Sequence, residues 1–431
     1  MTPTLRFYGC SSNWESVRLG DIADRVTRKN KGNETDIPLT ISSLDGLVDQ
    51  RTYFGKTVAS KDMSGYYLLK KGEFAYNKSY SVGFDFGSIK RLDHYDLGAL
   101  STLYICFALK EGCNSDFFVK YFDSQKWYKA VQAICAEGAR NHGLLNVPTT
   151  GFFDMELCIP SDKDEQQKIA DFLTAYDEKV SLQQQKVEAL ERRKKGLLQK
   201  VFSREIRFKT DDGSEFPEWK TKPFYEVFSI LGNNTLSRAE LNPDSGLAQN
   251  IHYGDVLIKF GAILDVSKES LPYIADEKLV VKQKQNALKN GDIIMADTAE
   301  DDTVGKCSEI VGITDEVIFA GLHTIPIRPA DGMFALRYLG YYINSTSFHD
   351  QLHPLIQGIK VSSISKSALQ NSTTVIVPQK AEQQKIADFF SAIDEQIEIE
   401  KKRLESMQTI KKGLLQQMFC DGSSEYEEGS R

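Results

Sequence analysis

Residues 165–173 read EQQKIADFL, and residues 382–390 read EQQKIADFF. Further along the chain, KKGLLQ stands at 194–199 and again at 411–416. Both matches keep one offset of 217 positions with no gap between them, which chance does not explain. The chain is therefore an internal repeat, and each copy of the repeated unit ends in the segment that carries these motifs.

The regions between the motifs differ from each other. They run from about 13 to 160 and from about 217 to 378, and both contain short β-branched and aromatic runs broken by Gly, Asn and Asp. Each region ends in an apolar segment with a proline, LCIP and VIVP, and each is long enough to form its own core. At the other end of the unit, Leu5-Arg6-Phe7 before Trp14 recurs loosely as Ile206-Arg207-Phe208 before Trp219.

The expected fold class is α+β, with two domains of mixed strands and helices joined by two long helices in a pseudo-two-fold internal repeat. The expected division of the chain is a first domain at 1–160, a first helix at 161–204, a second domain at 205–379, a second helix at 380–419 and an acidic, disordered tail at 420–431.

Apolar residues in the two repeated segments step by three and four positions, as in a heptad pattern. The first set is Ile169, Leu173, Tyr176, Val180, Val187, Leu190, Leu197 and Val201, and the second is Ile386, Phe390, Ile393, Ile397, Leu404, Met407, Leu414 and Met418. This period predicts a coiled coil. The alternative is that each helix is amphipathic and packs separately on its own domain.

Charge predicts the direction and register of this pair. Acidic residues crowd the first half of each segment and basic residues the second, so antiparallel pairing sets opposite charges against each other. One antiparallel register places Lys194 across from Glu400 and Gln183 across from Lys411, and paired polar residues of this kind fix register. Gly196 and its repeat indicate either a break in the helix or close approach of another backbone.

Composition excludes several classes of protein. The 431 residues are 41% hydrophobic and 26% charged with a net charge of −7, which is a globular balance and excludes a small basic DNA-binding module. No apolar run approaches the length of a membrane span, and the first ten residues do not resemble a signal peptide, so we expect a cytoplasmic protein without membrane contact. Seven cysteines without a Cys-x-x-Cys pair suit a reducing compartment.

No catalytic motif is complete. Asn242-Pro243-Asp244-Ser245 lacks the second proline and the aromatic ring of an amine-methylating loop. Gly55-Lys56-Thr57 has only the end of a phosphate-binding loop, and the spacing of His349 and His353 fits a zinc pair without the accompanying glutamate. We expect no catalytic residue, no metal and no cofactor.

The repeated motifs resemble the specificity subunit of type I restriction–modification systems. The resemblance rests on the proline, the Glu-Gln-Gln-Lys-Ile-Ala-Asp-Phe motif, Asp177-Glu178 and Lys-Lys-Gly-Leu-Leu-Gln, and it covers roughly residues 5–419. It implies two target-recognition domains separated by an antiparallel coiled coil, each domain reading one half of a bipartite double-stranded DNA site. It also implies two methyltransferase subunits, which modify adenine at N6 with S-adenosylmethionine, two ATP-driven restriction subunits, and no catalytic residues in this subunit.

Base reading needs Arg, Lys, Asn or Gln at base edges, together with many phosphate contacts. The densest candidate in the first domain is Tyr76-Asn77-Lys78-Ser79-Tyr80, which an ordinary exposed hairpin would explain equally well, and the next is the flexible loop with Arg140, Asn141 and His142. In the second domain Lys360, Ser362 and Ser363 fall at the place that matches this loop. Weaker DNA-binding candidates are Lys259, Lys306 and His323.

The acidic segment 297–302 would repel phosphate, and a structural role is the favoured interpretation, although it could also accept from cytosine amines or bind a cation. His323 could equally be a satisfied core histidine. The competing function for the whole chain is a protein scaffold whose two domains bind proteins without reading DNA.

Overall fold

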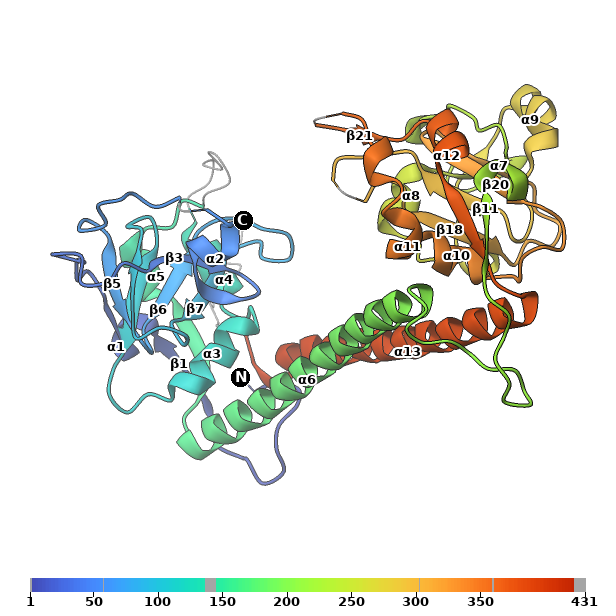
Figure 1. The fold of residues 1–431 in the computed structure, drawn as a ribbon. Coiled ribbons are helices and arrows are strands. Elements are labelled where there is room, and N and C mark those ends of the chain that lie inside the picture. Colours follow the sequence, from blue (N-terminus) through green and yellow to red (C-terminus); the bar gives the residue numbers. More distant parts are fainter. Residues whose placement is uncertain (1, 57, 136–144, 302, 359, 422–431) are drawn as a thin grey trace. The chain divides into compact units, whose positions relative to one another are not determined.

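The computed structural model describes residues 2–56, 58–135, 145–301, 303–358 and 360–421. It divides into two compact units, one of residues 1–184 with 402–431 and one of residues 185–401. Each unit holds one globular domain and one half of each of two long helices, α6 (Lys163–Phe202) and α13 (Lys380–Met418) (Figure 1). None of the helices in the described ranges has a stretch long and apolar enough to cross a membrane.

The first domain contains two four-stranded sheets, with strand orders β2-β9-β6-β7 and β4-β3-β8-β5, and a separate β1–β10 pair. Its strands are β1 (Trp14–Arg18), β2 (Ala23–Arg25), β3 (Pro38–Ser42), β4 (Gly46–Asp49), β5 (Tyr67–Lys70), β6 (Phe74–Asn77), β7 (Ser88–Arg91), β8 (Leu97–Leu100), β9 (Ile105–Leu109) and β10 (Glu156–Pro160). Its helices are α1 (Leu19–Ile22), α2 (Gln50–Phe54), α3 (Ser115–Asp123), α4 (Tyr128–Ile134) and α5 (Thr149–Asp154).

Helix α3 shows how the sequence builds this domain. The Asn114 side chain accepts a hydrogen bond from the N–H of Phe117 at 3.0 Å and caps the helix start. Phe118 and Tyr121 then follow at helical spacing and are buried in the aromatic core between the sheet and the helices. The opposite face of α3 carries charged residues that reach other elements.

The second domain contains a five-stranded sheet, β12-β20-β16-β18-β14, a three-stranded sheet, β15-β13-β19, and the pairs β11–β22 and β17–β21. Its strands are β11 (Lys220–Pro223), β12 (Phe228–Ile230), β13 (Ala248–Ile251), β14 (Ile263–Asp265), β15 (Tyr273–Ile274), β16 (Ile293–Ala296), β17 (Thr298–Ala299), β18 (Cys307–Val311), β19 (Ile318–Ala320), β20 (Thr324–Pro329), β21 (Ser362–Ser363) and β22 (Thr374–Val377). Its helices are α7 (Phe224–Val227), α8 (Tyr253–Ile258), α9 (Glu277–Gln283), α10 (Tyr338–Ile343), α11 (Thr346–His349) and α12 (Lys366–Ser372), with 3-10 turns η1 (Arg238–Glu240), η2 (Val266–Lys268), η3 (Lys284–Asn286) and η4 (His353–Leu355).

The repeated Glu-Gln-Gln motif attaches each domain to a long helix. In the first unit the buried carboxylate of Glu165 accepts hydrogen bonds from Arg6 at 2.6 Å and from the indole of Trp14 at 3.4 Å. In the second unit Glu382 accepts the same bonds from Arg207 at 3.0 Å and Trp219 at 2.7 Å. The loosely repeated segment before each domain therefore has a structural role. Its arginine and tryptophan supply hydrogen-bond donors to the buried glutamate of the Glu-Gln-Gln motif.

The segment before each domain also binds the end of a long helix. The N–H of Leu5 donates to the carbonyl of Gln417 in α13 at 2.9 Å, and the N–H of Ile206 donates to the carbonyl of Lys200 in α6 at 3.0 Å. Because Gln417 repeats Lys200, the two segments occupy equivalent places on the two helices.

The expected seam is confirmed in both helices. Every one of the sixteen predicted apolar seam positions is buried or half-buried, and Gln183 and Glu400 are buried among them. Helix α6 has 40 residues and α13 has 39, so each is about 60 Å long. Neither helix breaks at Gly196 or Gly413, and apart from the helix's own backbone and the adjacent residues no described atom lies within 4 Å of the place where a side chain would begin at either glycine.

The helices are antiparallel, in a register that differs from the expected one. Lys411 lies 2.7 Å from Asp177, and Lys194 lies 2.5 Å from Asp394. The two pairs are images of each other, since Asp394 repeats Asp177 and Lys411 repeats Lys194. Glu400, the expected partner of Lys194, pairs with Lys186 at 2.5 Å. The expected register paired only polar residues within the seam. In the structure the lysines instead pair with Asp177 and Asp394, which immediately follow seam residues.

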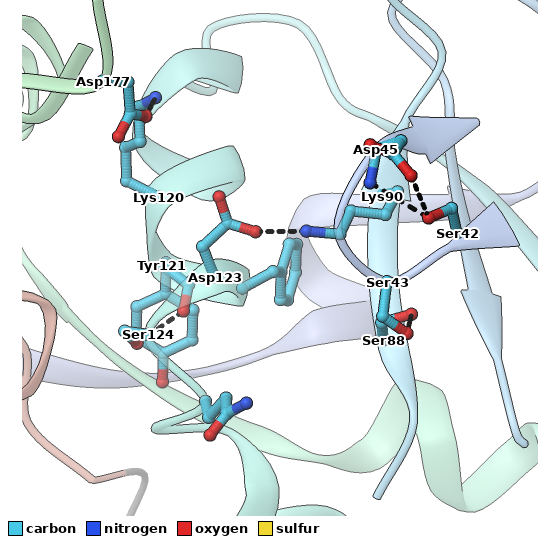
Figure 2. A network of polar contacts seen from close by, with 12 residues as sticks. Ser42, Ser43, Asp45, Ser88, Lys90, Lys120, Tyr121, Asp123, Ser124 and Asp177 are labelled. Carbon is cyan, nitrogen blue, oxygen red and sulfur yellow. Dashed lines mark hydrogen bonds and ion pairs between the residues drawn. The ribbon is translucent and has the colours of Figure 1, made fainter. Parts of the chain in front are cut away.

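Each of these aspartates also binds its own globular domain. Lys120 of α3 lies 2.6 Å from Asp177, and Asp123 on the same helix pairs with Lys90 of β7 at 2.7 Å (Figure 2). In the second unit the hydroxyl of Tyr341 in α10 donates to Asp394 at 2.8 Å. A single carboxylate therefore joins three elements in each unit, namely α6, α13 and one helix of the domain.

Candidate nucleic-acid interface

The candidate segment of the first domain begins inside the core. Tyr76 is fully buried on β6, stacks on Phe152 with ring centroids 4.8 Å apart, and donates its hydroxyl hydrogen to the carbonyl of Phe86 at 2.8 Å. Burial raises the pKa of this hydroxyl far above its usual range. The structure therefore places Tyr76 in the core rather than at the surface, because β6 is an inner strand whose two faces are both buried up to Tyr76.

The chain reaches the surface directly after this tyrosine. Asn77 ends β6 and accepts a hydrogen bond from the N–H of Ser79 at 3.0 Å, which forms a tight turn around Lys78. Lys78 and Ser79 are half-buried and Tyr80 is exposed. The ammonium of Lys78 has no ion-pair partner among the residues that the structure describes.

A backbone hydrogen bond joins this turn to the second candidate loop. The carbonyl of Lys78 accepts from the N–H of Leu145 at 2.9 Å. Leu145 directly follows residues 136–144, so the candidates Arg140, Asn141 and His142 lie outside the described residues. The structure thus brings the end of the second candidate loop to the first candidate segment.

The second domain repeats this arrangement. Asp297 follows the end of β16, as Lys78 follows β6, and its carbonyl accepts from the N–H of Ile364 at 2.8 Å. Strand β17 then pairs with β21, with Thr298 opposite Ser363 and residue 299 opposite Ser362. The same number of positions separates the two bonded residues in each domain, so Lys78 and Leu145 correspond in position to Asp297 and Ile364.

Three of the candidates in the second domain lie at this strand pair. Ser362 and Ser363 form β21, and exposed Lys360 precedes it. The acidic segment that begins at Asp297 contains β17, the partner of β21, and no sequence pattern indicates that these distant segments are neighbours.

His323 belongs to the same cluster. Its carbonyl accepts from the N–H of Asp297 at 3.1 Å, and its ring nitrogen Nδ1 lies 3.3 Å from the Asp297 carboxylate and 3.4 Å from the Thr298 hydroxyl. The edge of its ring meets the Tyr253 ring at a centroid distance of 5.2 Å. The side chain is 46% exposed, so His323 is not a core histidine. Its φ of 54° lies in the left-handed region, which non-glycine residues adopt at a cost.

The two remaining lysine candidates bind groups in their own domain. The ammonium of Lys306 donates to the carbonyl of Leu257 at 2.6 Å, and burial lowers the pKa of this lysine. Lys259 pairs with Glu269 at 2.6 Å. Within the described ranges, the ammonium groups of these two lysines form no hydrogen bond with Asp297, Thr298 or His323.

Nearly the whole chain matches a known protein family. The model of the type I restriction modification DNA specificity domain matches twice, at residues 11–192 and 217–409. The chain belongs to this family. Each match covers one globular domain and most of the long helix that follows it, which is the repeated unit found in the sequence.

Relatives of this specificity-domain protein cover its full architecture. A curated relative, the type I restriction enzyme MjaVIII specificity subunit of Methanocaldococcus jannaschii, is 23% identical over 416 residues, which are 94% of this chain and 91% of the relative. A solved chain from work on complex assembly and conformational transition of the type I R-M system has a TM-score of 0.59 at 16% identity and covers 97% of this chain and 100% of its own. The S subunit from M. genitalium has a TM-score of 0.51 at 15% identity, covering 98% of this chain and 100% of that one.

Among the described residues of this specificity-domain protein, no three His, Cys, Asp or Glu side chains gather as a metal site requires. His349, one of the two histidines at zinc-like spacing, instead has its Nε2 atom 3.0 Å from the carbonyl of Val304.

Proposed function

We propose that the chain is a non-catalytic DNA-recognition and assembly subunit that reads a bipartite double-stranded DNA target. The observation that carries the proposal is the duplicated loop arrangement at Lys78 and Asp297. Two domains of one architecture present different side chains at equivalent positions, which suits two half-sites of different sequence. Divergent loops on a repeated frame are less useful to a scaffold that binds two copies of one protein.

The helix pair would set the spacing between the two half-sites. Each domain is bonded to the helices through a buried glutamate and through a shared aspartate. These bonds hold each reading surface to the helices within its own unit. Changing helix length should therefore change the length of the non-specific gap in the target and leave both half-sites intact.

We further propose that two methyltransferase subunits bind to surfaces that the repeat supplies twice. Phe172 and its repeat Phe389 are 38% and 37% exposed, and Leu182 and its repeat Ile399 are both 65% exposed. Large apolar side chains that are exposed at the same position in both copies favour a partner that binds twice. We assign N6-adenine methylation, with its S-adenosylmethionine, to those partners and DNA cleavage to two restriction subunits.

The first experiment is co-expression of the full chain with its methyltransferase partner, followed by a genome-wide map of N6-methyladenine. We expect a two-part motif with a fixed gap. Insertion of one matched heptad into α6 and α13 should lengthen the gap only. Absence of any motif with a competent methyltransferase would favour the scaffold function.

The salt dependence of DNA affinity separates the same two functions in a purified complex. A DNA reader that neutralises several phosphates loses affinity steeply as salt rises, whereas a scaffold shows weak binding that salt hardly changes.

A further inference from the structure

Lys78 and Asp297 occupy the same place in the two domains. Each is the first residue after an inner strand, β6 or β16, and this strand pairs on one side with β9 or β20, respectively. The carbonyl of each accepts a hydrogen bond from the residue that closes the neighbouring loop, Leu145 at 2.9 Å or Ile364 at 2.8 Å. One position in the fold thus carries a cation in the first domain and an anion in the second.

We propose that this position determines base specificity, with Lys78 reading guanine in one half-site and Asp297 reading the exocyclic amine of cytosine in the other. The inference rests on the proposed DNA-recognition function. It goes beyond that function because it names the residues and the class of base that each one reads.

The chemistry of Lys78 fits the edge of guanine. An ammonium carries three N–H donors and no acceptor, and guanine presents two acceptors, O6 and N7, in the major groove. No carboxylate within the described ranges pairs with Lys78, in contrast to Lys90 and Lys120 of the same domain. The tight turn closed by Asn77 and Ser79 limits the directions that its stem can take.

The chemistry of Asp297 fits an amine donor. Its Oδ1 atom accepts from the hydroxyl of Thr298 at 2.7 Å and lies 3.3 Å from Nδ1 of His323. In the described part of the chain, Oδ2 receives no hydrogen bond. A carboxylate with one oxygen held by its own protein and the other free is a fixed acceptor, and cytosine N4 is the donor that aspartate reads in the major groove.

The surroundings hold this carboxylate in place. Asp297 is bonded to the turn at 321–323, and that turn is fixed by the N–H of Gly321, which donates to Ile251 at 2.8 Å, and by the hydroxyl of Thr324, which donates to Gly321 at 2.6 Å. An added Cβ at Gly321 would lie 2.8 Å from the carbonyl oxygen of Ile251 and still closer to Asn250, so this close approach requires glycine. A reading group on a fixed turn loses little conformational freedom when DNA binds.

The wild-type methylation motif is the first test, because it needs no variant. We expect at least one specified G·C pair in each half-site, since both guanine and the cytosine amine are presented by such a pair. A bipartite motif in which either half-site lacks a G·C pair would overturn the inference while leaving the proposed function intact. Absence of any bipartite motif would instead contradict the proposed function itself.

Two variants in the full complex then test which residue reads which base: Asp297→Asn, which keeps the shape of the side chain, and Lys78→Gln, which shortens it. Asp297→Asn keeps an acceptor for Thr298, yet an amide reads adenine, so methylation should shift toward adenine at one position of one half-site, with a loss of about tenfold in preference for cytosine. Lys78→Gln should relax the guanine position of the other half-site by a similar factor.

Matched controls separate base reading from phosphate contact and from folding. Lys71→Gln changes an exposed lysine at the opposite end of β6, and Asp315→Asn changes an exposed aspartate between β18 and β19; neither should alter the motif. Thermal unfolding shows whether each variant keeps its fold. Folded Lys78→Gln and Asp297→Asn complexes with the wild-type motif would show that this position does not read bases.

Discussion

Lys411 of α13 lies 2.7 Å from Asp177 of α6. The residues at the repeated positions, Lys194 and Asp394, form the same ion pair. The two helices are thus fixed by one interaction used twice. Because each aspartate also binds a globular domain, the same interaction links helix register to domain attachment.

Replacement of Asp177 should destabilise the protein more than loss of a surface ion pair. Asp177→Ala leaves Lys120, whose side chain is 11% exposed, without its carboxylate. We expect a loss of about 2 kcal/mol in the free energy of unfolding, measured in urea. Arg192→Ala, which breaks an exposed pair with Glu188 on the same helix, is the matched control and should cost less than about 0.5 kcal/mol. Equal effects of the two variants would contradict the role assigned to Asp177.

Glu165 should make stability fall in acid. Burial raises the pKa of this carboxyl, but hydrogen bonds from Arg6, Ser12 and Trp14 outweigh burial and hold the pKa below its ordinary value. A carboxyl with a lowered folded pKa contributes stability above its unfolded pKa, about 4.3, and loses this contribution as pH falls through the folded value. Glu165→Gln should lower the free energy of unfolding by about 2 kcal/mol at pH 7. Between pH 5 and 3 this variant should then lose less free energy of unfolding than the wild type. Urea titrations at several pH values measure this, with exposed Glu156→Gln as the control.

Glu309 should produce the opposite pH dependence. Burial raises its pKa to about 7, although the N–H groups of Arg337 and Gly340 donate to it at 2.5 and 2.8 Å and lower the pKa in part. A carboxyl with a raised folded pKa stabilises fully below its unfolded pKa, and the contribution declines as pH rises from about 4.3 to about 7. Between pH 5 and 8 the free energy of unfolding of the wild type should therefore fall more than that of Glu309→Gln. Parallel curves for the two proteins would refute the assignment.

Arg140→Ala should weaken DNA binding through phosphate contact at one half-site only. Loss of one such contact lowers the slope of log affinity against log salt by about 0.9. The measurement is a salt series on DNA with each half-site intact or scrambled in turn. Lys71→Ala serves as the control, and an unchanged slope for Arg140→Ala would remove this loop from the interface.

The repeat and the heptad pattern were sufficient to predict the two domains and both long helices, and the charge distribution along the helices predicted their antiparallel direction. The register was wrong because it paired only polar residues within the seam, whereas Lys411 and Lys194 pair with Asp177 and Asp394, which immediately follow seam residues. The position of Tyr76 could not be predicted either, since a tyrosine directly before the polar run Asn77-Lys78-Ser79 fits an exposed hairpin as well as the end of an inner strand. The cluster of Asp297, His323 and Ser363 joins three distant segments, which the pairing of β16 with β20 and of β17 with β21 brings together.

The buried glutamates that attach the domains affect how target specificity can change in evolution. Glu165 with Arg6 and Trp14, and Glu382 with Arg207 and Trp219, lie at or just beyond the margins of the divergent regions rather than in their interiors. Recombination that exchanges one interior for another would keep every member of this bonding set. A lineage could therefore acquire a new target in a single genetic event, whereas gradual change at one loop would pass through intermediates that read neither the old sequence nor the new one.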